Sequence, residues 1–368
     1  MKKTLSLLLM VVMVMGLFAG CTPKEEPAAE VTEAVEATEE VADENSGEPV
    51  ELIISTWGYN EDKLRKNVFD PFEQANNVKI ILETGNNSDR LNKIRTMENS
   101  TVDLIFLAGS FAIEGIEEGL FEQLDTANIP NMDSVYEIAK QPHGVGYGPA
   151  YTLNRTGIIY DSAMVDAPVV SWTDLWRPEF ESNLSIPEIT TTAGPAMVVL
   201  SGTVAGTDAL ENSDDAFEKL TELKPNLVKT YGRSSELVNM FTQGEIVIGV
   251  AQDFAFGRIK EAVPTAEWVN PTEGAFANLN TINVIKGSEN KELAEKFINW
   301  MLSEEVQKAN ALDKIDSPVN TNVSLTEEEA TGLTYGTELI NSLVVIDEIK
   351  VNAAKSDWID RWNREVSN

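Results

Sequence analysis

The cysteine and histidine content limits the chemistry that this sequence can perform. A single cysteine, Cys21, excludes an internal disulfide and a cysteine-rich metal site. A single histidine, His143, excludes a histidine metal cage and argues against a Ser-His-Asp triad. The nucleophile elbow, the P-loop and the zinc-protease motif do not occur in the sequence. We therefore expect a protein without cofactor or metal that is not an enzyme. A hydrolase using two of its many carboxylates stays as the alternative.

Acidic residues dominate the charged side chains. The 368 residues include 60 Asp or Glu and 28 Lys or Arg, which gives a formal net charge of −32. Such a charge argues against nucleic acid, whose phosphates require basic surfaces. It would suit a cationic ligand, but it is also typical of a solvated, soluble surface.

The N-terminal residues have the pattern of an export signal. Two lysines precede an apolar run over residues 5–18, too short for a comfortable membrane span. The sequence Leu17-Phe18-Ala19-Gly20 before Cys21 resembles the bacterial lipoprotein signal box. We expect residues 1–20 to be a signal peptide and Cys21 to carry the lipid, whose several acyl chains anchor stably. This predicts an extracytoplasmic protein anchored to the cell membrane.

The next segment has the composition of a spacer. Between residues 22 and 50 the chain has ten acids, one lysine and no aromatic residue. It repels itself and has too little apolar surface to offset the entropy of ordering. We expect residues 21–50 to be the lipidated cysteine followed by a disordered acidic spacer.

Strands and helices alternate from residue 51 onward, which predicts an α/β fold. The run at 102–107 is almost continuously apolar, as in a strand buried on both faces. Near the end of the chain we expect a long helix over residues 337–355 and a separate short helix over 357–365. The other expected strands are 51–56, 78–83, 158–160, 184–186, 228–230, 246–250 and 281–285, and the other expected helices are 63–74, 89–98, 195–206, 214–223, 234–242 and 290–302.

Several segments, in order along residues 51–368, resemble the solute-binding proteins of ABC importers, specifically the spermidine/putrescine receptors. The most specific is Ser-Trp-Thr-Asp-Leu-Trp-Arg-Pro-Glu-Phe at residues 171–180. The other matching segments are residues 54–59, 102–111, 146–161, 241–249, 286–303 and 317–320.

The resemblance implies a two-lobed periplasmic-binding-protein-like fold. Each lobe would have a mixed sheet flanked by helices, and two crossover strands would act as hinges. The first lobe would comprise residues 51–149 and 279–322, and the second 150–278 and 323–368. Ligand would bind in the cleft and close the lobes.

The resemblance also implies which residues line the cleft. In polyamine receptors, aromatic side chains hold the alkyl chain and carboxylates pair with the ammonium groups. Positions in the matching segments give the ligand-binding candidates Trp57, Tyr59, Ser110, Phe111, Thr192, Gln252, Asp253, Asn278 and Asn280.

This sequence departs from the family pattern at three of these segments. Where the family has acids after residue 184, residues 188–192 are Glu-Ile-Thr-Thr-Thr and carry mostly hydroxyls. Gln252 and Asp253 follow where the family has an aromatic. Asn278 and Asn280 stand where it has an aromatic and an aspartate. Asp253 is the candidate replacement for the lost acid. Amides and hydroxyls would suit a neutral polar ligand, and Arg155 or Arg233 would suit an anion.

The resemblance therefore implies the substrate-binding component of an ABC importer. It would capture a polyamine-type solute such as spermidine or putrescine and deliver it to permease and ATPase subunits. We expect a monomer that contacts the membrane through its lipid and does not bind nucleic acid. The alternative within the class is a receptor for a thiamine-like or amino-acid-derived solute.

Overall fold

The computed structural model describes residues 48–97 and 100–367. The expected signal peptide, Cys21 and nearly all of the expected spacer lie outside these residues. The described residues form one compact unit. None of the helices in the described part of the chain has the length and apolar character needed to cross a membrane.

The strands of the described chain form one mixed sheet of nine strands in the order β2-β1-β3-β9-β4-β7-β5-β6, with β8 paired to β4. They are β1 (Val50–Thr56), β2 (Val78–Thr84), β3 (Leu104–Ala108), β4 (Ala150–Asp161), β5 (Leu184–Pro187), β6 (Leu227–Tyr231), β7 (Ile248–Gln252), β8 (Ala266–Val269) and β9 (Phe276–Val284). Strands β2, β1 and β3 are parallel, as are β7, β5 and β6. Strands β4 and β9 are antiparallel to their neighbours and to each other. The predicted α/β class is confirmed.

The α-helices cover the sheet, and six short 3₁₀ segments and one π-helical segment connect or extend them. They are α1 (Glu61–Leu64), α2 (Asp70–Asn76), α3 (Asn87–Thr96), α4 (Gly109–Glu117), α5 (Glu137–Lys140), α6 (Gly194–Ala205), α7 (Asp214–Leu223), α8 (Ser234–Gln243), α9 (Phe256–Ala262), α10 (Lys291–Met301), α11 (Glu304–Leu312), α12 (Glu327–Ala330), α13 (Thr337–Asn341) and α14 (Glu348–Glu365). The expected helix at 63–74 is a continuous helical stretch in which the π-helical turn Arg65–Phe69 joins α1 to α2.

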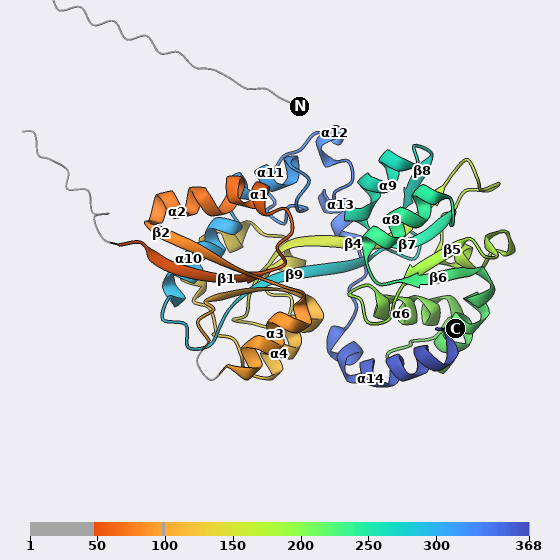
Figure 1. Ribbon diagram of the computed structural model, residues 1–368, viewed down its shortest axis with the longest axis horizontal. Helices are drawn as coiled ribbons and strands as arrows, with labels where there is room; N and C mark the ends of the chain where they lie inside the picture. Colours follow the sequence, from red (N-terminus) through yellow and green to blue (C-terminus); the bar gives the residue numbers. More distant parts are fainter. Residues whose placement is uncertain (1–47, 98–99, 368) are drawn as a thin grey trace, which may run out of the picture. The chain divides into compact units, whose positions relative to one another are not determined.

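Two lobes share the long strands β4 and β9. The first lobe consists of β1–β3 with α1–α4, α10 and α11, and the second of β5–β8 with α6–α9 and α14 (Figure 1). The C-terminal part of β9 pairs with β3 in the first lobe. The C-terminal part of β4 pairs with β7 and β8 in the second lobe. Because β4 and β9 are the strands that run from one lobe to the other, they are placed to act as the expected hinge strands.

Apolar residues on alternate sides of β3 explain why the first lobe needs helices on both faces. Phe106 packs in a cluster with Phe72 and Phe297 on one face. Ile105 and Leu107 pack with Leu91 on the other. The expectation that this strand is buried on both faces is confirmed.

The expected long helix at 337–355 is wrong. Helix α13 ends at Asn341, and α14 begins only at Glu348 and runs through the region expected to be a second helix. Between them Val344 pairs with β9, since its N–H donates to Ala275 O and its carbonyl accepts from Ala277 N, both at 2.9 Å. Tertiary backbone pairing therefore overrides local helical preference here. Val351, Trp358 and Trp362 pack together in the core of the second lobe.

Candidate functional site

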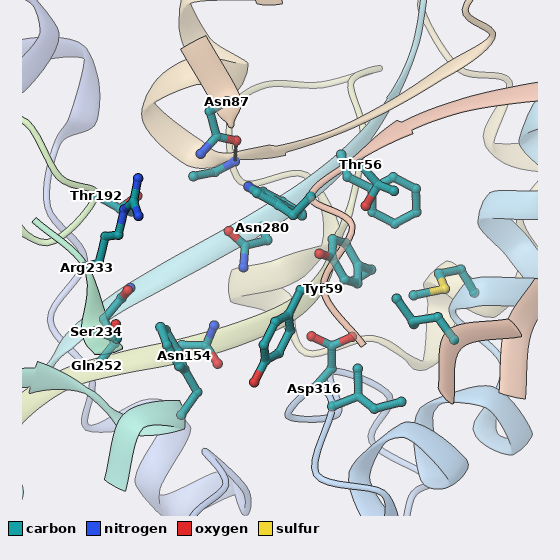
Figure 2. A pocket seen from close by; sticks show the side chains of 18 of the residues that line it. Thr56, Tyr59, Asn87, Asn154, Thr192, Arg233, Ser234, Gln252, Asn280 and Asp316 are labelled. Carbon is teal, nitrogen blue, oxygen red and sulfur yellow. Dashed lines mark hydrogen bonds between the residues drawn. The ribbon is translucent and has the colours of Figure 1, made fainter. Parts of the chain in front are cut away.

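A cavity of about 640 Å³ lies between the lobes. Its lining comes from both lobes and from the two hinge strands, which contribute Asn154 and Asn280 (Figure 2). Parallel strands of an open α/β sheet bind ligands beyond their carboxyl ends, and Thr56 and Ala108 end β1 and β3 here. The volume is that of a small-molecule site.

The first lobe gives the cavity an apolar wall. Trp57 and Tyr59 follow β1 directly, and the side chain of Tyr59 is 53% exposed. Such a large exposed aromatic facing a cavity gains burial when a ligand fills the space. The other apolar residues on this side are Leu64, Phe69, Phe106, Tyr151, Met301 and Ile315.

The turn that carries Trp57 and Tyr59 depends on Gly58 between them. Its φ of +69° is unfavourable for residues with a side chain, and an added Cβ would lie 3.0 Å from the Thr84 side chain. Arg90, at 4% exposure, supports the loop from inside the lobe. Its guanidinium donates to the carbonyls of Ser55 at 3.0 Å and Phe106 at 2.7 Å, at the ends of β1 and β3.

Asp316 brings an unpaired carboxylate to the cavity. It follows α11 in a loop that is held to β4, because Thr152 Oγ1 donates to Ser317 O at 3.0 Å. Burial raises the pKa of Asp316 to about 7, although the neighbouring Thr152 hydroxyl acts to lower it. Among the described residues, no Lys, Arg or His forms an ion pair with it. The phenol of Tyr151 stays protonated, because burial and the Asp316 charge both raise its pKa.

The second lobe gives the cavity a polar wall. Thr192, Ser234 and Gln252 contribute hydroxyl and amide groups, and Arg233 contributes a cation. Figure 2 shows Arg233 and Asp316 on opposite sides of Asn154, Asn280 and Tyr59. Phe254, which is 48% exposed, adds one aromatic ring on this side.

Five of the nine cleft residues expected from the sequence lie together around this cavity: Trp57, Tyr59, Thr192, Gln252 and Asn280. Ser110, Phe111 and Asn278 line a different and much smaller pocket of about 30 Å³, which shares Thr192 with the cavity. Helix α14 closes that pocket with Glu348 and Asn352.

Asp253 lines neither of these pockets. It is 2% exposed, and its Oδ2 accepts from Thr334 Oγ1 and lies 3.5 Å from Nη1 of Arg155. Burial raises the pKa of Asp253 to about 6. Arg155 in turn donates to Asn270, Thr334 and the carbonyl of Leu333. This buried pair therefore belongs to the internal packing next to the cavity, while Arg233 faces the cavity itself.

Sequence reasoning missed Asp316, Tyr151 and Asn154. Tyr151 and Asn154 stand on hinge strand β4, and Asp316 directly precedes the proline-bearing loop at 317–320. An acid next to a recognised cleft loop was the available signal. It was weak, because many acids of this chain lie next to loops.

Two lobes, two shared strands and a ligand-sized cavity between the lobes define the class of binding proteins that close on a small solute. The model of the bacterial extracellular solute-binding protein family matches residues 67–332, and the chain belongs to this family. Solute-binding components of ABC importers bind small solutes and work with permease and ATPase subunits, as the sequence resemblance implied.

Individual relatives agree with this assignment. The crystal structure of an ABC transporter from Clostridium perfringens is 48% identical, covers 86% of this chain and all of its own, and superimposes with a TM-score of 0.80. The spermidine/putrescine-binding periplasmic protein of Salmonella typhimurium is 23% identical over 66% of this chain and 70% of its own. The γ-aminobutyric acid-binding protein of Pseudomonas aeruginosa is 26% identical over 70% of this chain and 73% of its own.

Proposed function

We propose that this protein captures a small organic solute with a primary ammonium group on an alkyl chain and delivers it to an ABC permease. Spermidine, putrescine and γ-aminobutyric acid, which appear in the names of its relatives, share this group. The polyamine class expected from the sequence falls within the proposal. The protein itself would be non-catalytic.

The observation that carries the proposal is the carboxylate of Asp316 in the interlobe cavity. Asp316 is half-buried, and a carboxylate that is partly removed from water costs free energy unless a cation or hydrogen-bond donors compensate it. No cation of the described chain pairs with Asp316. An ammonium group of the ligand would supply the missing charge and form a charge-assisted hydrogen bond.

The apolar wall next to Asp316 supports an alkyl chain as the rest of the ligand. Leu64, Phe69, Met301 and Ile315 present hydrocarbon to the same cavity. Each methylene that they remove from water contributes about 0.8 kcal/mol. A hydrated inorganic cation would gain nothing from this wall.

The lobe boundaries expected from the sequence, 51–149 with 279–322 and 150–278 with 323–368, are part of the proposal. Bending in β4 and β9 would bring the lobes together around the ligand. Tyr59 and Arg258 already meet across the cleft, since Arg258 Nη2 donates to Tyr59 Oη at 3.3 Å.

We also propose that Cys21 is lipidated after removal of residues 1–20 and that residues 21–50 hold a monomeric binding domain off an extracytoplasmic membrane surface. The support is the signal-like sequence before Cys21 and the acidic composition after it. A Cys21→Ala variant would then be released from the membrane fraction of the expressing cell. Retention of this variant would contradict the anchor.

A thermal-shift screen at pH 8 tests the proposed ligand class. The amines would be spermidine, putrescine and γ-aminobutyrate, and the matched compounds without an amine would be 1,4-butanediol and butyrate. A ligand at 100 times its Kd stabilises by about 2.7 kcal/mol, which corresponds to a few degrees in Tm. We expect a shift with at least one amine and none with the matched compounds. No shift with any amine at millimolar concentration would contradict the proposal.

A further inference from the structure

The charged residues of the interlobe cavity are of opposite sign and come from opposite lobes. In the described chain, Asp316 and Arg233 are the charged side chains that line it. Asp316 lies on the apolar side and Arg233 on the polar side (Figure 2). A ligand that spans the cavity would therefore meet a negative group at one end and a positive group at the other.

Neither charge is neutralised within the described protein. Arg233 precedes α8 and is exposed, and its guanidinium forms no ion pair with a described residue. Asp316 likewise lacks a cation. A diamine would satisfy Asp316 but place its second ammonium group near Arg233, where like charges repel. An amine with an anionic far end would satisfy both residues.

The groups around Arg233 suit a carboxylate better than an ammonium group. Ser234 and Thr192 carry hydroxyls and Asn87 carries an amide, all of which can donate hydrogen bonds to oxygen. Ser234 also begins α8, whose N-terminus favours negative charge. Asn87, Thr192, Ser234 and Gln252 also line an adjoining cavity of about 410 Å³, whose described lining has no charged side chain. Arg233 is thus the charge that selects the ligand group at this end.

We propose that the ligand is an ω-amino acid, in which an unbranched alkyl chain joins a primary ammonium group at Asp316 to a carboxylate at Arg233. This inference rests on the proposed function and narrows it from alkylamines in general to those with an acidic far end. Closure of the lobes would bring both charged residues into contact with one ligand molecule. Each lobe would then bind one end of the ligand.

Calorimetric titration at pH 8 with four compounds tests the inference. The compounds are γ-aminobutyrate, 5-aminovalerate, putrescine and butylamine. We expect at least one of the two amino acids to bind ten or more times more tightly than either putrescine or butylamine. Tighter binding of putrescine, or equal binding of butylamine and the amino acids, would overturn the inference while leaving the proposed function intact. Absence of binding by all four would overturn the inference, and if spermidine also fails to bind, the proposed function falls with it.

The variant Arg233→Gln provides the second part of the test. Arg233 is exposed and forms no ion pair with a described residue, so we expect this variant to fold like the wild type. It should weaken binding of the amino acid at least tenfold and leave butylamine unchanged. The control Lys229→Gln removes an exposed cation of the same lobe that pairs with Glu245 and does not line the cavity. It should change neither the affinity for the amino acid nor that for butylamine. An unchanged preference in Arg233→Gln would overturn the inference.

Discussion

The guanidinium of Arg90 lies 4.8 Å from the centroid of the Trp57 ring. Trp57 lines the cavity, whereas Arg90 does not. Arg90 also binds the carbonyls of Gly85, Ser55 and Phe106, so one buried cation joins the ends of three neighbouring strands. Burial lowers the pKa of Arg90 to about 10, which keeps it charged at neutral pH. The position of the aromatic wall therefore depends on a residue that does not touch the ligand space.

Replacing Arg90 tests this dependence. Arg90→Lys keeps the charge but loses the planar fork that reaches several carbonyls at once. We expect Tm to fall by several degrees, because buried carbonyls lose donors at about 1–3 kcal/mol each, and amine affinity to fall about tenfold as Trp57 loosens. Calorimetry and thermal unfolding measure both. Arg95→Lys, on the exposed side of the same helix, should change Tm little, since its ion pairs with Glu114 and Glu118 are near the surface. Equal behaviour of the two variants would rule out the supporting role of Arg90.

The contact between Tyr59 and Arg258 should influence ligand release. The Arg258 guanidinium lies 6.0 Å from the Tyr59 ring centroid, across the cleft. We expect Arg258→Ala to raise the dissociation rate of a bound amine about two- to fivefold with Tm unchanged, because the contact is exposed and weak. Stopped-flow tryptophan fluorescence measures the rate. Glu261→Ala on the same helix is the control, and a faster rate in that variant as well would argue against a specific contact.

Much of this architecture could be predicted from local sequence, and much of the site could not. Apolar alternation predicted the type and place of most strands, and the family resemblance identified Trp57 and Gln252 as cleft residues. Asp316 and Arg90 reach the site through contacts between distant segments, which residue spacing does not reveal. Asp253 was expected in the cleft because it is an acid, but it pairs with Arg155 inside the protein. The failed helix at 337–355 has the same origin, since Val344 pairs with a strand far away in sequence.

The buried carboxyl of Glu348, between α14 and α4, should make the fold less stable at alkaline pH. Its Oε2 has no hydrogen-bond partner among the described residues, and burial raises its pKa to about 7. A group with a raised pKa in the folded state stabilises the fold below its ordinary pKa and loses that contribution as pH rises through about 7. We expect Glu348→Gln to raise Tm by a few degrees at pH 8 but much less at pH 5. His143, which packs beside Gly109 with Glu348, acts in the opposite direction, because burial lowers its pKa to about 4.

Melting curves from pH 5 to pH 8 measure this effect. Glu338→Gln, which changes an exposed acid on α13, is the matched control and should follow the wild type. A Glu348→Gln variant that follows the wild type at every pH would show that Glu348 is not strained by burial.

Amine affinity should depend on pH through Asp316. The ligand pairs with the ionised carboxylate, and the unliganded pKa is about 7. Protons therefore compete with the ligand, and affinity should fall about tenfold for each pH unit below 7 and level off near pH 8. Calorimetric titration of putrescine and γ-aminobutyrate at pH 5, 6, 7 and 8 measures the profile. A flat profile for every amine that binds would mean that Asp316 is already ionised or does not contact the ligand.

The most direct test of the account is the amine affinity of Asp316→Asn. Asparagine keeps the shape of the side chain but removes the charge that would pair with the ammonium group. We expect Kd for putrescine or γ-aminobutyrate, whichever binds the wild type more tightly, to rise about 100-fold at pH 8. Tm of the unliganded variant should not fall, because a half-buried charge without an ion-pair partner among the described residues has been removed. The control is Asp313→Asn, three residues before Asp316 in the sequence. Asp313 forms an ion pair with the exposed Lys66, and this variant should keep wild-type affinity. Wild-type affinity in Asp316→Asn would contradict the account.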